Sequence, residues 1–267
     1  MEAAMEALKA FLPSLEQSHH TLVWTMLIIA PVTFVTLVFG PVAPYGRYTR
    51  SGWGPQLNGT FAWITMEAPS LLVMLALTRS AGLFSQPIDW ASPRILLAAA
   101  FLVHYTYRAI IFPLNIRGGK TTPLTVWAMS FTFCCWNGFI QGWSLSHEVA
   151  SEAVISPRLV VGLILWACGF LSVVHTDMSL TRLRRPGESG YKIPRGGMFE
   201  LVSAGNYASE MLEWTGFAIA AGTLPAAAFA LFTFCNLAPR GVAHHKWYLT
   251  KFDDYPKSRK AVIPFLW

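Results

Sequence analysis

Seven apolar stretches, each close to the length of a membrane span, constrain the fold of this chain more than any other feature. A helix needs about 20 apolar residues to cross the hydrocarbon core of a bilayer. The candidate spans are residues 22–42, 61–77, 95–114, 123–145, 159–174, 206–223 and 225–238. So few residues separate the last two that they could instead form one bent, re-entrant unit. The pattern predicts an all-α integral membrane protein with a bundle of about seven transmembrane helices.

The composition agrees with a membrane environment. Hydrophobic residues make up 54% of the 267 residues and charged residues only 13%, against about 25% charged residues in soluble domains. A soluble chain of this composition would expose large apolar patches. The four cysteines lie inside apolar runs without disulfide or metal-ligand spacing, so we expect no metal site. Early acidic residues precede the first apolar run, which argues against a cleavable signal peptide.

Lysine and arginine are distributed unequally between the two sets of connecting segments. Fifteen of the twenty lie in residues 43–60, 115–122, 175–205 and 239–267, and four lie in the alternate segments. Basic segments remain in the cytoplasm, so we expect a cytoplasmic C-terminus. The membrane would be that of the endoplasmic reticulum in a eukaryote or the cytoplasmic membrane in a bacterium. The net charge of +6 reflects either this bias or a site for a polyanionic cofactor. Nucleic acid is not expected, because the basic residues do not gather on one soluble face.

Ionisable side chains inside the predicted spans are candidates for function. A charged side chain at the bilayer centre costs roughly 2.5–3.5 kcal/mol on insertion scales. Glu67 lies mid-span, and Arg108 follows His104 and Tyr105 within about one turn of the third span. Structural explanations exist: a carboxyl bonded to backbone groups that Pro69 frees, or an arginine that reaches the interface. The functional interpretation is a hydrogen-bonding pair, Glu67 and Tyr105, in an apolar cavity.

Polar residues of a different kind gather near the predicted cytoplasmic side. Residues 177–206 hold five basic side chains and five glycines, which suit the diphosphate of a dinucleotide. Anionic lipid is the alternative ligand for such a cluster. The sixth span adds Asn206, Glu210 and Glu213, and the first two share one helix face. A glycine-rich motif after a strand and a P-loop are both missing from the sequence, so a Rossmann or Walker site is not supported.

Several ordered motifs make the chain from residue 45 to 267 resemble a known family. They are PYGRYT at 44–49, MEAPS at 66–70, HYTYR at 104–108, RGGK at 117–120, NGFIQG at 137–142, and the long stretches 175–218 and 244–267. The sequence resembles the steroid 5α-reductases (3-oxo-5α-steroid 4-dehydrogenases). At Met66, Met129, Val173 and Thr176 it departs from the family pattern, so we expect differences in cofactor grip and steroid preference.

The resemblance implies a seven-helix bundle that encloses NADPH and a 3-keto-4-ene steroid, and that reduces the 4,5 double bond to give a 5α-dihydrosteroid. Glu67 and Tyr105 match the pair that hydrogen-bonds the 3-keto oxygen, and Trp63 matches a wall of the steroid pocket. Arg108 is added as a substrate residue because it lies about one turn from Tyr105. The residues expected at the cofactor are Tyr45, Arg117, Lys120, Asp177, Arg184, Tyr191, Lys192, Asn206, His244 and Tyr248.

We expect one domain, with residues 1–174 forming mostly the substrate cavity and residues 175–267 providing the cofactor loop, the last helices and a cytoplasmic tail. The expected partners are a steroid or sterol-like substrate and the lipid bilayer, without an obligate protein partner. Three other functions remain open. They are a sterol or enone double-bond reductase, a membrane methyltransferase that uses S-adenosylmethionine, and a transporter or lipid-binding protein, although we see none of the inverted repeats common in transporters.

Overall fold

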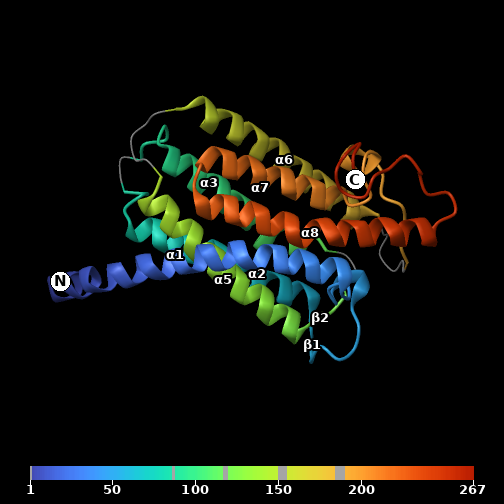
Figure 1. Cartoon of the computed structure of the whole chain (residues 1–267), viewed down its shortest axis with the longest axis horizontal. Helices are drawn as coiled ribbons and strands as arrows, with labels where there is room; N and C mark the ends of the chain where they lie inside the picture. The colour runs from blue at the N-terminus through green and yellow to red at the C-terminus, as the bar shows by residue number, and fades with distance from the viewer. Residues whose placement is uncertain (1, 86–87, 117–119, 150–154, 184–189) are drawn as a thin grey trace.

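The described part of the chain is mostly helical (Figure 1). The structure, a computed structural model, describes residues 2–85, 88–116, 120–149, 155–183 and 190–267. Its long helices are α1 (Glu2–Phe39), α2 (Gly59–Ser80), α3 (Pro93–Thr106), α5 (Leu124–His147), α6 (Pro157–Arg182), α7 (Gly205–Ala221) and α8 (Leu224–Lys251). The third continues through a π-helical turn, η2 (Tyr107–Ile111), into the short α4 (Phe112–Leu114). Each predicted span falls on one of these helices, which confirms the all-α membrane fold.

Within the described residues, five helices are long and apolar enough to cross a membrane by length and composition. They correspond to α1, α2, α3 with its continuation, α6 and α8. The other two, α5 and α7, lie inside the same bundle. Of these, α7 has only 17 residues, and α5 buries several polar side chains toward its C-terminal half.

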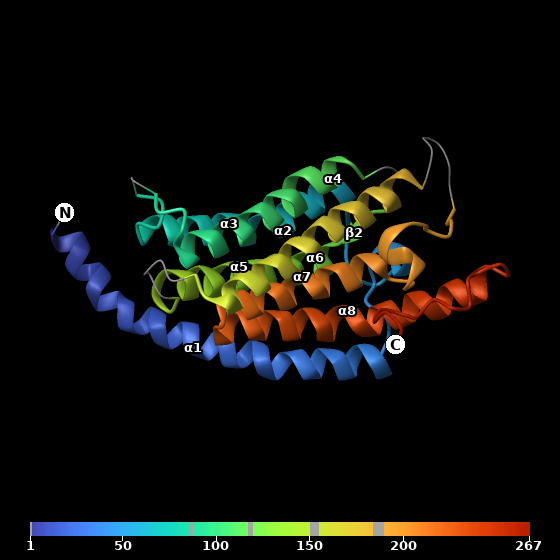
Figure 2. The same cartoon turned by 90° about the horizontal axis from the view of Figure 1, so that it is seen from above.

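The helices form one elongated bundle whose axes run roughly along its length (Figure 2). The closest neighbours are α6 with α7, α2 with α5, and α1 with α8, and α7 also packs against α8. The C-terminus and the strands β1 (Gln56–Leu57) and β2 (Thr122–Pro123) lie at the same end (Figure 1). We call this end the basic end, because the arginine-rich and lysine-rich segments of the sequence lie there.

Glycines allow α6 and α7 to pack in close contact. A Cβ atom at Gly162 or Gly169 of α6 would collide with the backbone of Ala220 or Glu213 on α7. At Gly216 of α7, it would collide with α6. Close approach through small residues is a common way for membrane helices to associate. The α6–α7 contact therefore fixes the position of Glu213.

Two helix boundaries differ from the predictions. The fifth span was predicted to end at residue 174, but α6 continues to Arg182, so Asp177 lies on a helix. The last span was predicted to end at residue 238, but α8 continues to Lys251 and carries His244 and Tyr248. Hydropathy marks where a helix leaves the hydrocarbon core, whereas the helix itself continues into the polar region. The helices α7 and α8 are separate, and they are joined at Gly222, which adopts a left-handed conformation with φ 62°.

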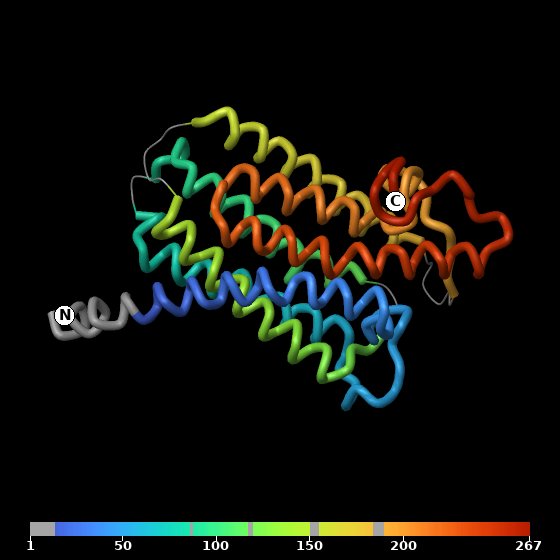
Figure 3. Tube along the Cα trace, in the orientation of Figure 1, coloured from blue at the N-terminus to red at the C-terminus, as the bar shows by residue number. Residues whose placement is uncertain are grey.

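Connections at the basic end hold distant parts of the chain together. The strands β1 and β2 pair antiparallel, and the segment near Lys260 pairs with Leu201–Ala204 through three backbone hydrogen bonds of 2.8–3.0 Å. The C-terminal segment thereby returns to the ends of α6 and α7 (Figure 3). A short 3-10 turn, η1 (Gly46–Tyr48), lies in the segment between α1 and α2. These connections position the aromatic and basic side chains described below.

Candidate active site

Glu67 of α2 points into the bundle. The thiol of Cys134 on α5 lies 3.9 Å from its Oε2, and its carboxyl lies within electrostatic reach of Arg108 and Glu210. The side chain is only partly accessible. Pro69, two residues later on α2, has no backbone N–H to donate within the helix. This carboxyl is therefore a polar group of the interior rather than of the lipid-facing surface.

Tyr105 of α3 lies beside Glu67. The tyrosine is buried, and its hydroxyl oxygen accepts a hydrogen bond of 3.1 Å from Nδ2 of Asn137 on α5. The carboxyl of Glu67 acts on the phenol electrostatically, and Ser70 of α2 is also in contact. Because Asn137 donates to the oxygen, the phenolic hydrogen remains available for another acceptor. The pair can therefore present hydrogen-bond donors to one carbonyl oxygen when Glu67 is protonated.

Arg108 of η2 and Asp177 of α6 form an ion pair. Nη1 of Arg108 lies 3.1 Å from Oδ2 of Asp177 on α6. Its guanidinium lies over the rings of Trp63 and Phe112, 5.0 and 4.8 Å from their centroids. Arg108 lies in the π-helical turn η2, a deviation that often occurs at functional sites. The structure thus brings together Trp63 and Arg108, predicted at the substrate, and Asp177, predicted at the cofactor.

A second group of polar residues, at the basic end, surrounds Arg47. The guanidinium lies 4.5–5.1 Å from the ring centroids of Tyr191, Trp247 and Tyr248. Its Nη2 donates a hydrogen bond of 3.1 Å to the hydroxyl of Tyr248. Its Nη1 is buried and has no hydrogen-bond partner in the described part of the chain. The guanidinium of Arg47 is therefore enclosed by aromatic rings and keeps one buried nitrogen, Nη1, without a partner among the described residues.

Arg240 fixes the segment that carries Arg47. This buried arginine of α8 donates to the hydroxyl of Tyr207 at 2.7 Å and to the carbonyls of Ala43 and Tyr45 at 3.1 and 3.0 Å. Its guanidinium also lies 3.6 Å from the centroid of the Tyr45 ring. Burial raises the pKa of Tyr45 to about 12, although the charge of Arg240 opposes the shift. Tyr45 is therefore a neutral phenol at physiological pH.

The basic end fits a polyanionic ligand. Besides Nη1 of Arg47, the hydroxyl of Tyr48 and Nε2 of His244 are buried without hydrogen-bond partners among the described residues. The ring of His244 lies between those of Tyr48 and Tyr207, with centroids 5.5 and 5.2 Å away. Unpaired buried donors are costly unless a ligand or water satisfies them. Among the described residues, no group of three or more potential metal ligands occurs.

Glu210 of α7 connects the two groups of residues. It lies within electrostatic reach of Tyr45 at the basic end and of Glu67 and Arg108 deeper in the bundle. We call the carbonyl-binding candidates, the polyanion-binding candidates and Glu210 together the polar region of the bundle.

The structure places most of the predicted site residues along this region. Tyr45, Tyr191, His244 and Tyr248 lie in the basic-end group, and Asn206 precedes Tyr207 in the first turn of α7. Lys120 and Lys192 are exposed. Arg117 and Arg184 lie outside the described residues.

The sequence analysis missed several residues of the same region: Arg47, Tyr48, Asn137, Tyr207 and Arg240. Signals for some of them were present. Arg47 and Tyr48 belong to the PYGRYT motif, and Asn137 begins NGFIQG. Arg240 is an arginine inside an apolar run, the kind of residue that needs a partner in a membrane.

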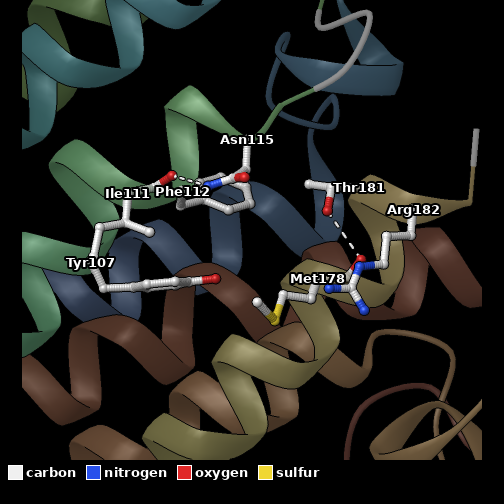
Figure 4. Close-up of a pocket in the computed structure, with 7 residues that line it drawn as sticks. All are labelled: Tyr107, Ile111, Phe112, Asn115, Met178, Thr181 and Arg182. Atoms are coloured by element: carbon white, nitrogen blue, oxygen red, sulfur yellow. Dashed lines mark hydrogen bonds between the residues drawn. The ribbon is translucent and has the colours of Figure 1, made fainter. Parts of the chain in front are cut away.

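A separate pocket of about 120 Å³ lies between η2, α4 and the end of α6. Figure 4 shows its lining from η2, α4 and the end of α6, with Tyr107, Asn115, Met178 and Arg182 around it. Its lining includes none of the predicted site residues. We do not assign it to the reaction.

Comparisons with known proteins point to one family. The family model described as 3-oxo-5-alpha-steroid 4-dehydrogenase matches residues 120–267. The chain is 47% identical to 3-oxo-5-alpha-steroid 4-dehydrogenase 1 of Bos taurus, over 84% of this chain and 88% of that protein. It is 45% identical to the Homo sapiens protein of the same name, over 83% and 85%. It is 39% identical to steroid 5-alpha-reductase DET2 of Arabidopsis thaliana, over 91% and 94%.

Proposed function

Because the chain belongs to the 3-oxo-5-alpha-steroid 4-dehydrogenase (steroid 5-alpha-reductase) family, a family of steroid oxidoreductases, we propose that it reduces the 4,5 double bond of a 3-keto-4-ene steroid with NADPH to give a 5α-dihydrosteroid. One observation carries the assignment of the site. Glu67 and Tyr105 lie within electrostatic reach of each other inside the bundle. Asn137 donates a hydrogen bond to the phenol oxygen of Tyr105, so the phenolic hydrogen can be donated to a substrate oxygen.

Glu67 and Tyr105 hold the 3-keto oxygen in this proposal. A protonated carboxyl and a phenol both donate, and the surrounding helices exclude water. Hydrogen bonds to the carbonyl draw electron density from the conjugated double bond, which makes its β-carbon electrophilic. As reduction proceeds, negative charge moves to the oxygen of the resulting enolate, and uptake of a proton by the α-carbon then gives the saturated ketone. Donors placed for that charge stabilise the transition state more than the ground state.

The residues of the basic end would hold the cofactor. NADPH would supply the hydride, which is the chemistry the cofactor brings. Arg47, with Tyr48 and His244 beside it, offers unpaired donors for phosphate oxygens. Arginine forms charge-assisted bonds with phosphate, so these side chains favour a phosphorylated dinucleotide. Tyr45, Asp177, Asn206 and Tyr248 would complete the binding surface between this end and Glu67.

We also propose that the basic end faces the cytoplasm. The chain is a multi-pass membrane protein by its apolar helices, and its lysines and arginines concentrate at this end. An orientation with this end inside gives the chain access to cytoplasmic NADPH. The relatives reported above are eukaryotic proteins, which favours the endoplasmic reticulum. Protease protection of a C-terminal epitope in sealed microsomes tests this orientation.

Product analysis tests the proposed reaction. Purified protein in nanodiscs is incubated with NADPH and testosterone or progesterone, and the steroids are separated by chromatography with mass spectrometry. The expected product is the saturated 5α-ketone, formed with matching loss of NADPH absorbance. The matched control is Tyr105→Phe, which keeps the ring but lacks the donor. If neither steroid is consumed while the protein stays folded, the proposed substrate class is wrong.

A further inference from the structure

A buried histidine and a buried glutamate are in hydrogen-bond contact beside Tyr105. Nδ1 of His104 on α3 lies 2.7 Å from Oε1 of Glu213 on α7, and the side chains are 3% and 0% exposed. The ring of His104 also lies 4.9 Å from that of Tyr105. Neither residue has a role in the proposed reaction. Two ionisable groups so deep in a membrane protein nevertheless call for an explanation.

Aromatic side chains pack against this pair. The ring of His104 packs edge-on against Trp214, with centroids 4.5 Å apart, and Phe170 lies on another side. The backbone of Glu213 packs against Gly169 of α6. Its second carboxyl oxygen, Oε2, is buried and has no hydrogen-bond partner among the described residues. A bare carboxylate oxygen in such a place is expensive.

The ionisable groups that face the pair do not compensate a negative charge. Glu67 of α2, Arg108 of η2 and Glu210 of α7 lie within electrostatic reach of His104. On the α6 side, Asp177 lies within reach of Glu213, as does Arg108. Asp177 already pairs with this arginine. The pair therefore sits among three other acids and one arginine that is already engaged.

The contact distance limits the arrangements of hydrogen. One hydrogen must lie between Nδ1 and Oε1, because two acceptors at 2.7 Å would repel each other. If this is the only hydrogen of the ring and the carboxyl carries no other, the pair has a charge of minus one. One more proton, on Nε2 or on Oε2, makes the pair neutral overall. A hydrogen on Oε2 would have no acceptor among the described residues, so we place the additional proton on Nε2. The unpaired Oε2 and the neighbouring acids both favour the neutral arrangement.

We propose that His104 and Glu213 together hold this additional proton, and that it keeps a negative charge away from Glu67 and Tyr105 while the substrate oxygen becomes anionic. The inference rests on the proposed reduction of a steroid enone. His104 and Glu213 act here as positioning residues: they act on the reaction through the field at Tyr105 and Glu67. A fixed negative charge next to an emerging enolate opposes its formation, whereas a neutral pair does not.

Nuclear magnetic resonance tests the proton directly, without steroid or cofactor. The full chain is labelled with ¹⁵N-histidine in nanodiscs, and the signals of His104 are assigned by their loss in His104→Gln. A hydrogen on Nε2 at neutral pH that is lost at alkaline pH is the expected result. A bare Nε2 at neutral pH overturns the proposal. This measurement uses the wild-type protein, so it decides the question even if variants of Glu213 fail to fold.

The pH dependence of turnover gives the second test. In the wild-type protein, kcat should fall on the order of tenfold at alkaline pH, in parallel with the loss of the Nε2 hydrogen and with little change in KM. In Glu213→Gln the side chain is neutral at every pH, so the alkaline fall should disappear. Ser209→Ala is the matched control, since it removes a hydrogen bond between α7 and α6 that involves no titratable group. It should keep the wild-type profile.

An alkaline fall that persists unchanged in Glu213→Gln overturns the proposal. A failure of the proposed function would look different: the wild-type protein would form no saturated ketone at any pH, while the Nε2 hydrogen of His104 would still be observed.

Discussion

Asn137 donates a hydrogen bond of 3.1 Å to the phenolic oxygen of Tyr105, and this bond joins α5 to α3 inside the bundle. Both residues are buried, so water does not replace the bond when it is lost. The direction of donation matters, because it leaves the hydrogen of Tyr105 free for a substrate oxygen.

Tyr105→Phe should therefore lower kcat by on the order of 10²–10³, the usual cost of losing one oxyanion donor. Asn137→Leu should lower it by roughly 3–10-fold through misplacement of the phenol. Ser146→Ala, on the same helix and bonded only to its own turn, is the control, and equal turnover in all of these proteins contradicts the assignment.

Glu67 should be needed as a protonated acid. Glu67→Gln retains a donor of similar shape but polarises the carbonyl less, and Glu67→Ala removes the donor. We expect kcat to fall by on the order of 10²-fold in the glutamine variant and further in the alanine variant. Single-turnover measurements with saturating NADPH separate this effect from binding. Wild-type turnover in Glu67→Gln would rule out a catalytic role for this carboxyl.

Arg47 should recognise a phosphate of the cofactor. Thermal-shift titrations with 2′,5′-ADP and with 5′-AMP isolate the contribution of the 2′-phosphate. Loss of a charged hydrogen bond costs about 1.5–3 kcal/mol, so Arg47→Gln should lower the affinity for 2′,5′-ADP by roughly 10–100-fold. Arg50→Gln changes an exposed arginine in the same segment and should have little effect. An equal loss of affinity for both nucleotides would place Arg47 at the shared 5′-phosphate. An unchanged affinity for both would mean that Arg47 does not contact the cofactor.

The close contact of α6 and α7 should be intolerant of a single methyl group at Gly169. Its Cβ would collide with the backbone of Glu213, so the helices must separate. We expect Gly169→Ala to lower the free energy of unfolding by roughly 1–3 kcal/mol and to reduce the Tm measured in detergent. Cys168→Ala, at the exposed neighbouring position, serves as the control. A Tm for Gly169→Ala equal to that of the control would mean that the contact is looser than described.

Glu200 should make the stability of the basic end depend on pH. Its Oε1 accepts a 2.6 Å hydrogen bond from the backbone N–H of Gly196, and its Oε2 lies 3.3 Å from Arg259. The hydrogen bond from Gly196 and the charge of Arg259 lower the pKa of this carboxyl. The stabilisation is therefore present above the ordinary pKa of glutamate and is lost as pH falls through the lowered value. Glu200→Gln should reduce the Tm at neutral pH and should flatten its fall in acid; an identical pH dependence in both proteins contradicts this.

The membrane fold followed from the sequence because the length and spacing of apolar runs specify helices in a bilayer. Glu67 and Tyr105 could also be predicted from the sequence, because their motifs are local. The contact that holds them in place could not be predicted. Asn137 reaches Tyr105 only because α5 packs beside α2 and α3, and the sequence contains no record of which helices become neighbours.

The basic end was the least predictable part for a similar reason. Arg47 and Tyr248 are 201 positions apart, and the bond between them depends on how Arg240 holds the segment after α1 against α8. The ends of α6 and α8 were also misplaced. Hydropathy detects where side chains leave the lipid, but backbone hydrogen bonding continues wherever the residues tolerate a helix.

The side-by-side packing of α1 and α8 sets a condition on biosynthesis. The ribosome makes α1 first, and residues 40–223 must follow before α8 appears. At about 5–20 residues per second this interval is about 10–40 s. During it, the surface of α1 that will contact α8 is covered only by lipid or by an insertion factor. Assembly of the nascent protein should therefore be sensitive to ribosome pausing within the middle of the message.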